Sequence, residues 1–307
     1  MTSPIAAIDC GTNTIKLLIA EAAPGGRMRE LVREARMVRL GQDVDRTGRL
    51  APEAMARTFA AVDEYAAAIA EHGVERIRFC ATSATRDSAN AAEFADGVRA
   101  RLGVAPEVLT GAEEAALAFA GSVDAVPADR PRPVLVVDIG GGSTELISGH
   151  DVPTAAYSMD VGSVRLHERH LHSDPPTADE IAALLADVDA VLDACPVDPA
   201  AAGTVLGVAG TVTTLAAGAL GLPAYERAAI HGAVLPVGDV VAVVGRIVAM
   251  TVAERRALGY LHPGRADVIG AGGLILRRIL ERSGASTLLV SEADILDGIA
   301  ASLVAER

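Results

Sequence analysis

Aromatic residues and lysine are scarce in this chain of 307 residues. It has no tryptophan, aromatic residues make up only 3% of it, and Lys16 is the single lysine among 27 basic residues. Single-stranded nucleic acids bind through aromatic stacking and positive charge, so this composition and the net charge of −13 argue against a nucleic-acid partner. Two interpretations of Lys16 stay open: a site that needs a compact ammonium, and chance retention in an arginine-biased sequence.

Cysteine is also rare. The three cysteines, Cys10, Cys80 and Cys195, include no Cys-x-x-Cys pair, so neither a disulfide framework nor a zinc cage is expected, and a reducing cytoplasm fits. The N-terminus lacks the basic start of a secretion signal. The uncharged stretch 200–225 is long enough to cross a bilayer, but its glycines and threonines favour a buried strand, turn and small-residue helix. No membrane partner is expected.

The chain contains an internal duplication. Apolar runs flank the polar turn after Asp9 within 5–19, and the same pattern returns around Asp138 within 134–147, 129 positions later. Half of the residues are hydrophobic, and the length suits two domains. We therefore expect two domains, 1–126 and 127–307, joined by a proline-rich linker that begins at Pro127.

Strands alternate with helices in both halves, which predicts an α/β fold. In the first half, the expected elements are a helix over 52–73, a strand over 77–81, a helix ending at Gly103, a strand over 104–109 and a helix over 110–121. In the second half, they are a helix capped by Thr177 and Glu180, a strand over 205–208 that leads into a helix, a glycine-rich helix start over 268–274, a strand over 288–290 and a helix over 295–304.

Glycine-containing turns after buried strands predict phosphate binding. Such turns direct several backbone N–H groups to one point, and glycine lets a polyanion approach the backbone. Two of them, one in each domain, would face each other across a cleft and hold a phosphate chain, with Gly272-Gly273 as a further glycine-rich turn. The expected phosphate-binding residues are Gly11, Thr12, Asn13, Thr14, Gly140, Gly141, Gly142, Ser143, Gly210 and Thr211, with positive charge from Lys16, Arg86 and Arg265.

Acidic side chains beside the turns suggest a metal site. Asp138 ends a buried strand and Glu145 lies on the return strand, and Mg²⁺ is often bound by one or two carboxylates together with phosphate and water. Asp9 occupies the equivalent position in the first half and is included in the expected metal set. The alternative is that the aspartates only form turns, which is less satisfactory for two of them in equivalent contexts.

Two neighbouring glutamates follow Thr110. Thr110 and Glu113 have the spacing of a capping box, so Glu113 has a structural role. Glu114 lies about 100° further round the helix and could face a cleft, where it would accept a proton from an attacking water. A solvated acid at a helix N-terminus is the simpler interpretation from spacing alone. For His167, His170 and His172, a solvated helix face is favoured over zinc binding.

Several motifs together resemble the exopolyphosphatase and guanosine pentaphosphate phosphohydrolase family, within the actin, Hsp70 and sugar kinase fold. The resemblance covers nearly the whole chain and is carried by residues 9–14, 82–87, 111–115, 138–145, 210–214, 231–232 and 265–267. It implies two ribonuclease-H-like domains flanking a central cleft, a homodimer, and Mg²⁺-dependent release of orthophosphate from inorganic polyphosphate, with Mn²⁺ as a possible substitute.

The resemblance also implies roles for particular residues. Glu114 matches the catalytic base, Asp138 and Glu145 the metal-associated acids, and Gly140–Ser143 the phosphate loop. Many relatives have an arginine two places after the base, where this chain has Ala116, so one phosphate contact is missing or supplied elsewhere. Longer relatives carry further domains, which puts processive degradation of long chains in doubt here.

The expected mechanism is in-line attack of water on a terminal phosphoryl group. Four alternatives remain. Guanosine pentaphosphate could replace polyphosphate as substrate, and nothing in the sequence separates the two. An ATP-using kinase or chaperone of the same fold is disfavoured by the chain length. An aspartic protease is disfavoured because Cys10 and Ile139 stand between Asp and Gly where Thr or Ser is usual. The protein could also be a non-catalytic phosphate sensor.

Overall fold

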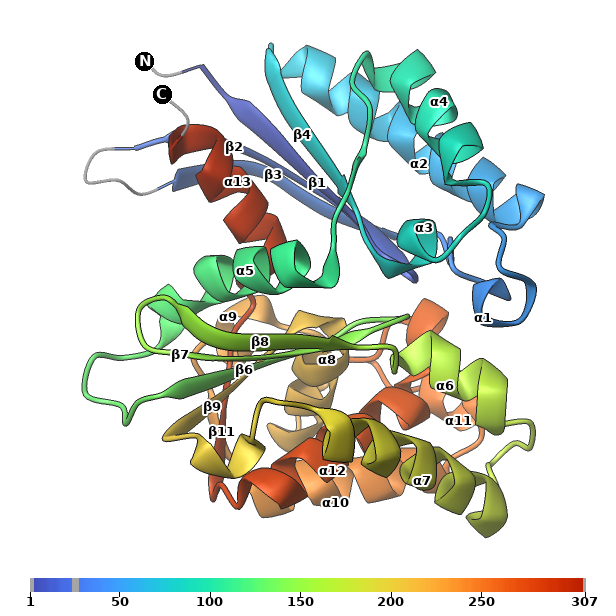
Figure 1. The fold of residues 1–307 in the computed structure, drawn as a ribbon, viewed down its shortest axis with the longest axis vertical. Helices are drawn as coiled ribbons and strands as arrows, with labels where there is room; N and C mark the ends of the chain where they lie inside the picture. The colour runs from blue at the N-terminus through green and yellow to red at the C-terminus, as the bar shows by residue number, and fades with distance from the viewer. Residues whose placement is uncertain (1–2, 24–27, 306–307) are drawn as a thin grey trace. The chain divides into compact units, whose positions relative to one another are not determined.

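The computed structural model describes residues 3–23 and 28–305. Its contacts divide the chain into two compact α/β units, Met1–Gly121 with Ile295–Arg307, and Ser122–Asp294 (Figure 1). The expected boundary after residue 126 lies close to the observed one. The last helix departs from the expectation, because it belongs to the first unit and not to the second. The two units are described separately below.

The first unit contains a five-stranded sheet in the order β3-β2-β1-β4-β5. The first three strands pair antiparallel, and β4 and β5 continue the sheet parallel to β1. This order is the ribonuclease-H-like arrangement that the resemblance implied. The strands are β1 Ile5–Cys10, β2 Thr14–Ala22, β3 Met28–Met37, β4 Arg76–Ala81 and β5 Glu107–Val108.

Alternation along the strands of this sheet gives it two apolar faces. Ile8 and Leu17 pack with residues of α2 and α4, whereas Ala7 and Leu18 pack with Ile299 of α13 on the opposite face (Figure 1). Neighbouring residues of a strand point to opposite faces, so a sheet covered on both sides needs apolar residues at every position. The helices are α1 Val44–Thr47, α2 Pro52–Glu71, α3 Ser83–Arg86, α4 Ala91–Leu102, α5 Gly111–Ser122 and α13 Ile295–Ala305.

The final helix, α13, is fixed to the first unit by its own residues. Leu296 and Ile299 enter the core, and Asp297 forms an ion pair with Arg33 of β3. A Cβ atom at Gly298 would collide with the carbonyl oxygen of Leu117 in α5, so glycine permits the close approach of the two helices. These contacts explain why a segment that is distant in sequence completes the first unit.

The second unit repeats the same strand order with one addition. Its sheet has the order β10-β11-β9-β6-β7-β8, in which β6, β7 and β8 pair antiparallel and β9 and β11 run parallel to β6. The short strand β10 adds an antiparallel edge. The strands are β6 Val134–Ile139, β7 Thr144–Gly149, β8 Pro153–Met159, β9 Thr204–Val208, β10 Val234–Pro236 and β11 Thr287–Val290.

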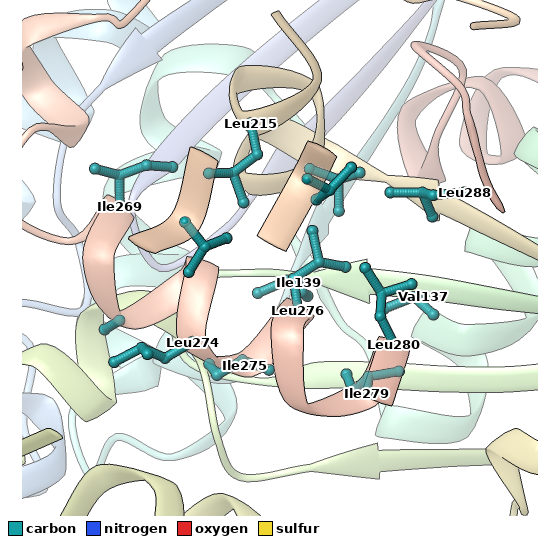
Figure 2. Close-up of a cluster of buried hydrophobic side chains, with 14 of the residues drawn as sticks. Val137, Ile139, Leu215, Ile269, Leu274, Ile275, Leu276, Ile279, Leu280 and Leu288 are labelled. Carbon is teal, nitrogen blue, oxygen red and sulfur yellow. The ribbon is translucent and has the colours of Figure 1, made fainter. Parts of the chain in front are cut away.

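Helices cover one face of this second sheet and form a large apolar core. Figure 2 shows side chains of α12 gathered with Val137 and Ile139 of β6 and Leu215 of α8 in this core. The apolar stretch within α10 also packs here through Val240 and Val244. The helices are α6 Ser163–His170, α7 Ala178–Ala194, α8 Ala209–Ala219, α9 Arg227–Ile230, α10 Val237–Ala249, α11 Val252–Arg256 and α12 Ile269–Ser283.

Most of the expected elements are present. The expected strand over 104–109 is reduced to β5, while β3, β8 and β10 were not predicted. The uncharged stretch 200–225 forms buried strand β9 and helix α8, as expected. None of the helices within residues 3–23 and 28–305 combines the length and hydrophobicity that a bilayer crossing requires.

Candidate functional site

The polar turns after β1 and β6 have the same backbone geometry. The N–H of Gly11 donates to the carbonyl oxygen of Thr14 at 3.0 Å, and the N–H of Gly140 donates to that of Ser143 at 3.0 Å. A Cβ atom at Gly140 would lie 3.2 Å from the Ser143 oxygen, so both turns are tight enough to favour glycine. The duplication seen in the sequence therefore extends to individual hydrogen bonds.

In the second unit, helix α6 orders the turn over 140–143. The N–H groups of Ser163 and Val164 donate to the carbonyl oxygens of Gly140 and Gly141, and Arg165 Nε donates to that of Gly142 at 2.7 Å. Among the described residues, the N–H groups of 141, 142 and 143 have no acceptor. The turn thus has its carbonyls satisfied and a row of N–H groups available, which is the arrangement of an anion-binding nest.

The first unit orders its turn with residues that follow β3. The N–H groups of Val38 and Arg39 donate to the carbonyl oxygen of Asn13, and the N–H of Gly41 donates to that of Thr12. Within residues 3–23 and 28–305, the N–H groups of Thr12 and Asn13 have no acceptor. The carbonyls of Thr12 and Asn13 are therefore satisfied by flanking backbone.

Side chains from other segments support this first turn, and one of them, Met37, was not identified from the sequence. The hydroxyls of Thr12 and Ser83 are 2.9 Å apart, and Thr14 Oγ1 donates to the sulfur of Met37 at 3.2 Å. Asn13 donates to the same sulfur at 3.7 Å, and its buried Oδ1 has no hydrogen-bond donor in the described part of the chain. A buried acceptor of this kind needs an external donor such as water.

Glu113 and Glu114 have the separate roles that their spacing predicts. The N–H of Thr110 donates to Glu113 at 2.8 Å and the N–H of Glu113 donates to Thr110 Oγ1 at 3.2 Å, which is a complete capping box. Glu114 is only 8% exposed and accepts a hydrogen bond from Arg86 Nη1 at 2.9 Å. The simpler interpretation of Glu114 as a solvated acid is therefore wrong.

The surroundings of Glu114 change its proton affinity. Burial raises the pKa of Glu114 to about 7, because the charged carboxylate loses hydration, while the hydrogen bond and charge of Arg86 act in the opposite direction. The nearby negative charge of Asp9 adds to the increase. A carboxyl group with a pKa near neutrality can both accept and release a proton at physiological pH.

Asp9 and Lys16 lie together in the first unit. They are directly opposite each other on β1 and β2, and Lys16 Nζ is 3.1 Å from Asp9 Oδ2. Side chains of directly opposed residues point to the same face of a sheet, which explains the pairing. Asp9, expected in the metal set, is therefore in contact with an ammonium group.

Asp138 and Glu145 occupy the corresponding positions in the second unit. They are directly opposite each other on β6 and β7 and are 7% and 1% exposed. Ser158 of β8 donates to Glu145 Oε1 at 2.7 Å and was not identified from the sequence. The described residues include no cluster of three or more His, Cys, Asp or Glu side chains that could hold a metal.

Gly210, Thr211 and Arg265 meet at the start of α8. The Arg265 guanidinium lies where a Cβ atom of Gly210 would be, and Nη1 is 3.4 Å from the Gly210 carbonyl oxygen. Burial lowers the pKa of Arg265, whereas the charges of Tyr225 and Glu292 act to raise it. A half-buried cation beside a helix N-terminus, which carries partial positive charge, favours an anion at this point.

Two other sequence features have structural roles. A Cβ atom at Gly272 would lie 2.6 Å from Thr211 Cγ2, so Gly272 allows α12 to pack closely on α8 and is not arranged as a phosphate turn. His170 Nε2 lies 2.9 Å from Asp187, which also pairs with Arg169. These contacts connect α6 and α7.

The fold and these turns define a duplicated α/β protein with an N–H-rich polar turn in each unit. The family model of the Ppx/GppA phosphatase family matches residues 18–306. Exopolyphosphatase 2 of Mycobacterium tuberculosis is 48% identical to this chain, with 97% of this chain and 98% of that protein covered.

Solved structures of exopolyphosphatases and Ppx/GppA proteins are also similar to this chain. An exopolyphosphatase from Cytophaga hutchinsonii has a TM-score of 0.90 at 28% identity, covering 99% of this chain and 98% of that one. The Ppx/GppA family member of Aquifex aeolicus has a TM-score of 0.81 at 31% identity, covering 100% and 99%. The chain belongs to the Ppx/GppA phosphatase family.

Proposed function

We propose that this protein is an exopolyphosphatase, which hydrolyses the terminal phosphoanhydride bond of inorganic polyphosphate and releases orthophosphate. The observation that carries the proposal is the repeated turn, which in each unit has satisfied carbonyls and available N–H groups. Amide-rich turns of this kind suit phosphate oxygens. The 48% identity to a protein named as an exopolyphosphatase supports the choice of substrate.

The proposed phosphate-binding groups come from both units. In the first unit they are the N–H groups of the turn over 11–14, with Lys16 and Arg86. In the second they are the turn over 140–143, together with Gly210, Thr211 and Arg265. The position of the half-buried Arg265 beside the start of α8 supports its role, because an anion there would offset two sources of positive charge.

Glu114 is the proposed general base. Water attacks the terminal phosphorus, a new P–O bond forms, and the bond to the bridging oxygen breaks. Glu114 accepts the proton of the attacking water, and the shortened chain leaves with its negative charge held by N–H groups and arginines. The raised pKa of Glu114 supports this role, since a base with a pKa of about 7 binds a proton more strongly than an ordinary carboxylate.

We also propose that Asp138 and Glu145 hold Mg²⁺. Their carboxylate oxygens are hard donors on adjacent strands, and two carboxylates leave coordination positions for water and substrate oxygens. Mn²⁺ shares this preference for oxygen ligands. When bound, the ion would neutralise charge on the phosphoryl oxygens. The substitution Asp138→Asn should raise the Mg²⁺ concentration needed for half-maximal activity by about tenfold, because it removes one carboxylate ligand.

The function is tested by measuring orthophosphate release from short polyphosphate, long polyphosphate and guanosine pentaphosphate in parallel. The proposal expects the highest kcat/KM on polyphosphate. Preference for guanosine pentaphosphate would assign the alternative substrate to the same site. Binding of polyphosphate without any release of orthophosphate would instead identify a sensor.

A homodimer and a cytoplasmic location are part of the same proposal. In the apolar stretch 240–250, Val240, Val243 and Ile247 are buried inside the second unit, so these three side chains are not available for a dimer contact. Light scattering of the purified protein measures the oligomeric state directly.

A further inference from the structure

The two polar turns correspond residue by residue and differ at one charged position. The offset that relates Asp9 to Asp138 also relates Gly11 to Gly140 and Lys16 to Glu145. The glycine hydrogen bond is 3.0 Å in both turns, so the correspondence is structural as well as sequential. An acid at the end of the first strand is common to both units, whereas its neighbour on the return strand is basic in one unit and acidic in the other.

Strand register gives these neighbours the same geometry. Asp9 is directly opposite Lys16, and Asp138 is directly opposite Glu145. In the first unit the result is an ion pair of 3.1 Å between groups that are 6% and 18% exposed at their side chains. In the second unit two carboxylates share one face, an arrangement that is unfavourable without a compensating cation or donors.

The two units also differ in the residue that the next strand, β3 or β8, places beside Lys16 or Glu145. The residue opposite Lys16 on β3 is Ala35, which offers no polar side chain. The residue opposite Glu145 on β8 is Ser158, whose hydroxyl donates to Glu145 at 2.7 Å and leaves the other carboxylate oxygen to serve other partners. The second unit is thus built around an oriented carboxylate pair and the first around a carboxylate and an ammonium.

We propose that Lys16 supplies in the first unit the positive charge that a divalent cation supplies in the second, so that the chain binds one divalent cation and Asp9 is not a ligand. This inference rests on the proposed metal site at Asp138 and Glu145. The lysine ammonium is a compact point charge, which suits it to replace an ion beside a carboxylate. The proposal also gives a role to Lys16, which is the single lysine of the chain.

The proposal predicts that a change of charge at position 16 changes the number of metal sites. The protein is titrated with Mn²⁺ alone, and free Mn²⁺ is measured by electron paramagnetic resonance. Salt at about 0.1 M screens the surface acids. The unmodified protein should bind one Mn²⁺ ion tightly per chain. Lys16→Glu recreates the carboxylate pair in the first unit and should give two. Lys16→Gln, which removes the charge and introduces no carboxylate, should still give one.

Variants of the aspartates test the same assignment without altering Lys16. Asp9→Asn should leave the Mn²⁺ dissociation constant within twofold of its original value, whereas Asp138→Asn should raise it at least tenfold. A tenfold loss of Mn²⁺ affinity in Asp9→Asn would overturn the proposal. So would two tight ions in the unmodified protein, or one ion in a Lys16→Glu variant whose circular dichroism shows a folded chain.

The outcome is separable from the proposed function. A protein that releases orthophosphate and binds two ions would retain the function and lose this inference. A protein that binds one ion, with the expected behaviour of its variants, and releases no orthophosphate from any phosphate chain would retain this inference and lose the function.

Discussion

At the scale of single residues, Glu113 and Glu114 show how two adjacent identical side chains reach different environments. Glu113 is exposed and closes the capping box of α5, whereas Glu114 is buried against Arg86. The helical rotation between neighbours is enough to separate an exposed capping acid from a buried one. This contrast provides a matched pair of variants.

Glu114→Gln should lower kcat by about 10²–10⁴-fold, because the amide cannot accept the proton of the attacking water. Its shape and its contact with Arg86 are largely retained, so polyphosphate affinity should change little. Glu113→Gln is the control, since glutamine also completes a capping box and only a neighbouring charge is removed. Orthophosphate release and equilibrium binding measure the two quantities. A Glu114→Gln variant with most of its original rate would remove Glu114 from the mechanism.

The pKa of Glu114 sets a second expectation. A general base must be deprotonated, so kcat/KM should rise with pH and level off above about pH 7. Arg86 lowers this pKa, so Arg86→Met should move the rising limb to higher pH, whatever it does to the maximal rate. Complete pH–rate profiles of both proteins provide the comparison. An unchanged limb in the variant would show that a different group controls the profile.

At the scale of elements, the prediction from sequence succeeded where each segment carries its own signal. The two hairpins were predicted because apolar runs flank a polar turn, and α7 because Thr177 and Glu180 form a capping box, which the structure contains. Strand β8 was missed because it is largely exposed, and β3 because it is only partly buried and rich in charged residues. Their stability comes from pairing with a neighbouring strand, which a local pattern does not reveal.

Part of the candidate site also carries signals in the sequence itself. The turn residues and Glu114 carry local signals, such as glycine after a buried strand and a capping box beside a second acid. Met37 reaches the first turn, and Ser158 reaches Glu145, only through strand pairing, and each is an ordinary residue in its own segment. Spacing can therefore identify the residues that a turn contains, but not the side chains that other strands deliver to it.

The close contact between α13 and α5 makes an element-level prediction. Gly298→Ala should destabilise the protein by about 1–3 kcal/mol, because the added methyl group must displace the Leu117 backbone. The same displacement moves the helix that carries Glu114, so kcat should fall as well. Gly245→Ala in α10 is the matched control, since its added Cβ meets open space and should stabilise the helix by about 0.5–1 kcal/mol. Chemical denaturation measures both, and equal effects would contradict the packing argument.

At the scale of the whole molecule, an acidic protein is proposed to bind a polyanion. The net charge of −13 acts over long distances and is weakened by salt, while cations that touch phosphate groups act at short range. We expect the short-range contacts with phosphate to outweigh the long-range repulsion, because charged groups that line one site determine the local electrostatic potential there. The composition of the chain alone therefore does not decide which anions it binds.

Salt dependence tests this balance. In Glu114→Gln, which we expect to bind substrate with little turnover, the dissociation constant for polyphosphate should rise with salt concentration. The additional change Arg265→Gln should reduce the slope of log Kd against log salt by about one, as loss of one phosphate contact predicts. Arg99→Gln, at an exposed arginine paired with Asp96, should leave the slope unchanged. A dissociation constant that falls with salt would show that long-range repulsion governs binding.

The return of the last helix to the first unit also has a consequence for biosynthesis. Because a nascent polypeptide emerges from its N-terminus, the entire segment Ser122–Asp294 leaves the ribosome before α13 becomes available. The first unit begins to fold earliest and is completed last, with one face of its sheet waiting for Leu296 and Ile299. A product that terminates before α13 would thus leave this apolar face uncovered, and chaperones and proteases can recognise such a face. In that product α5, which bears Glu114, would also lack its packing partner α13.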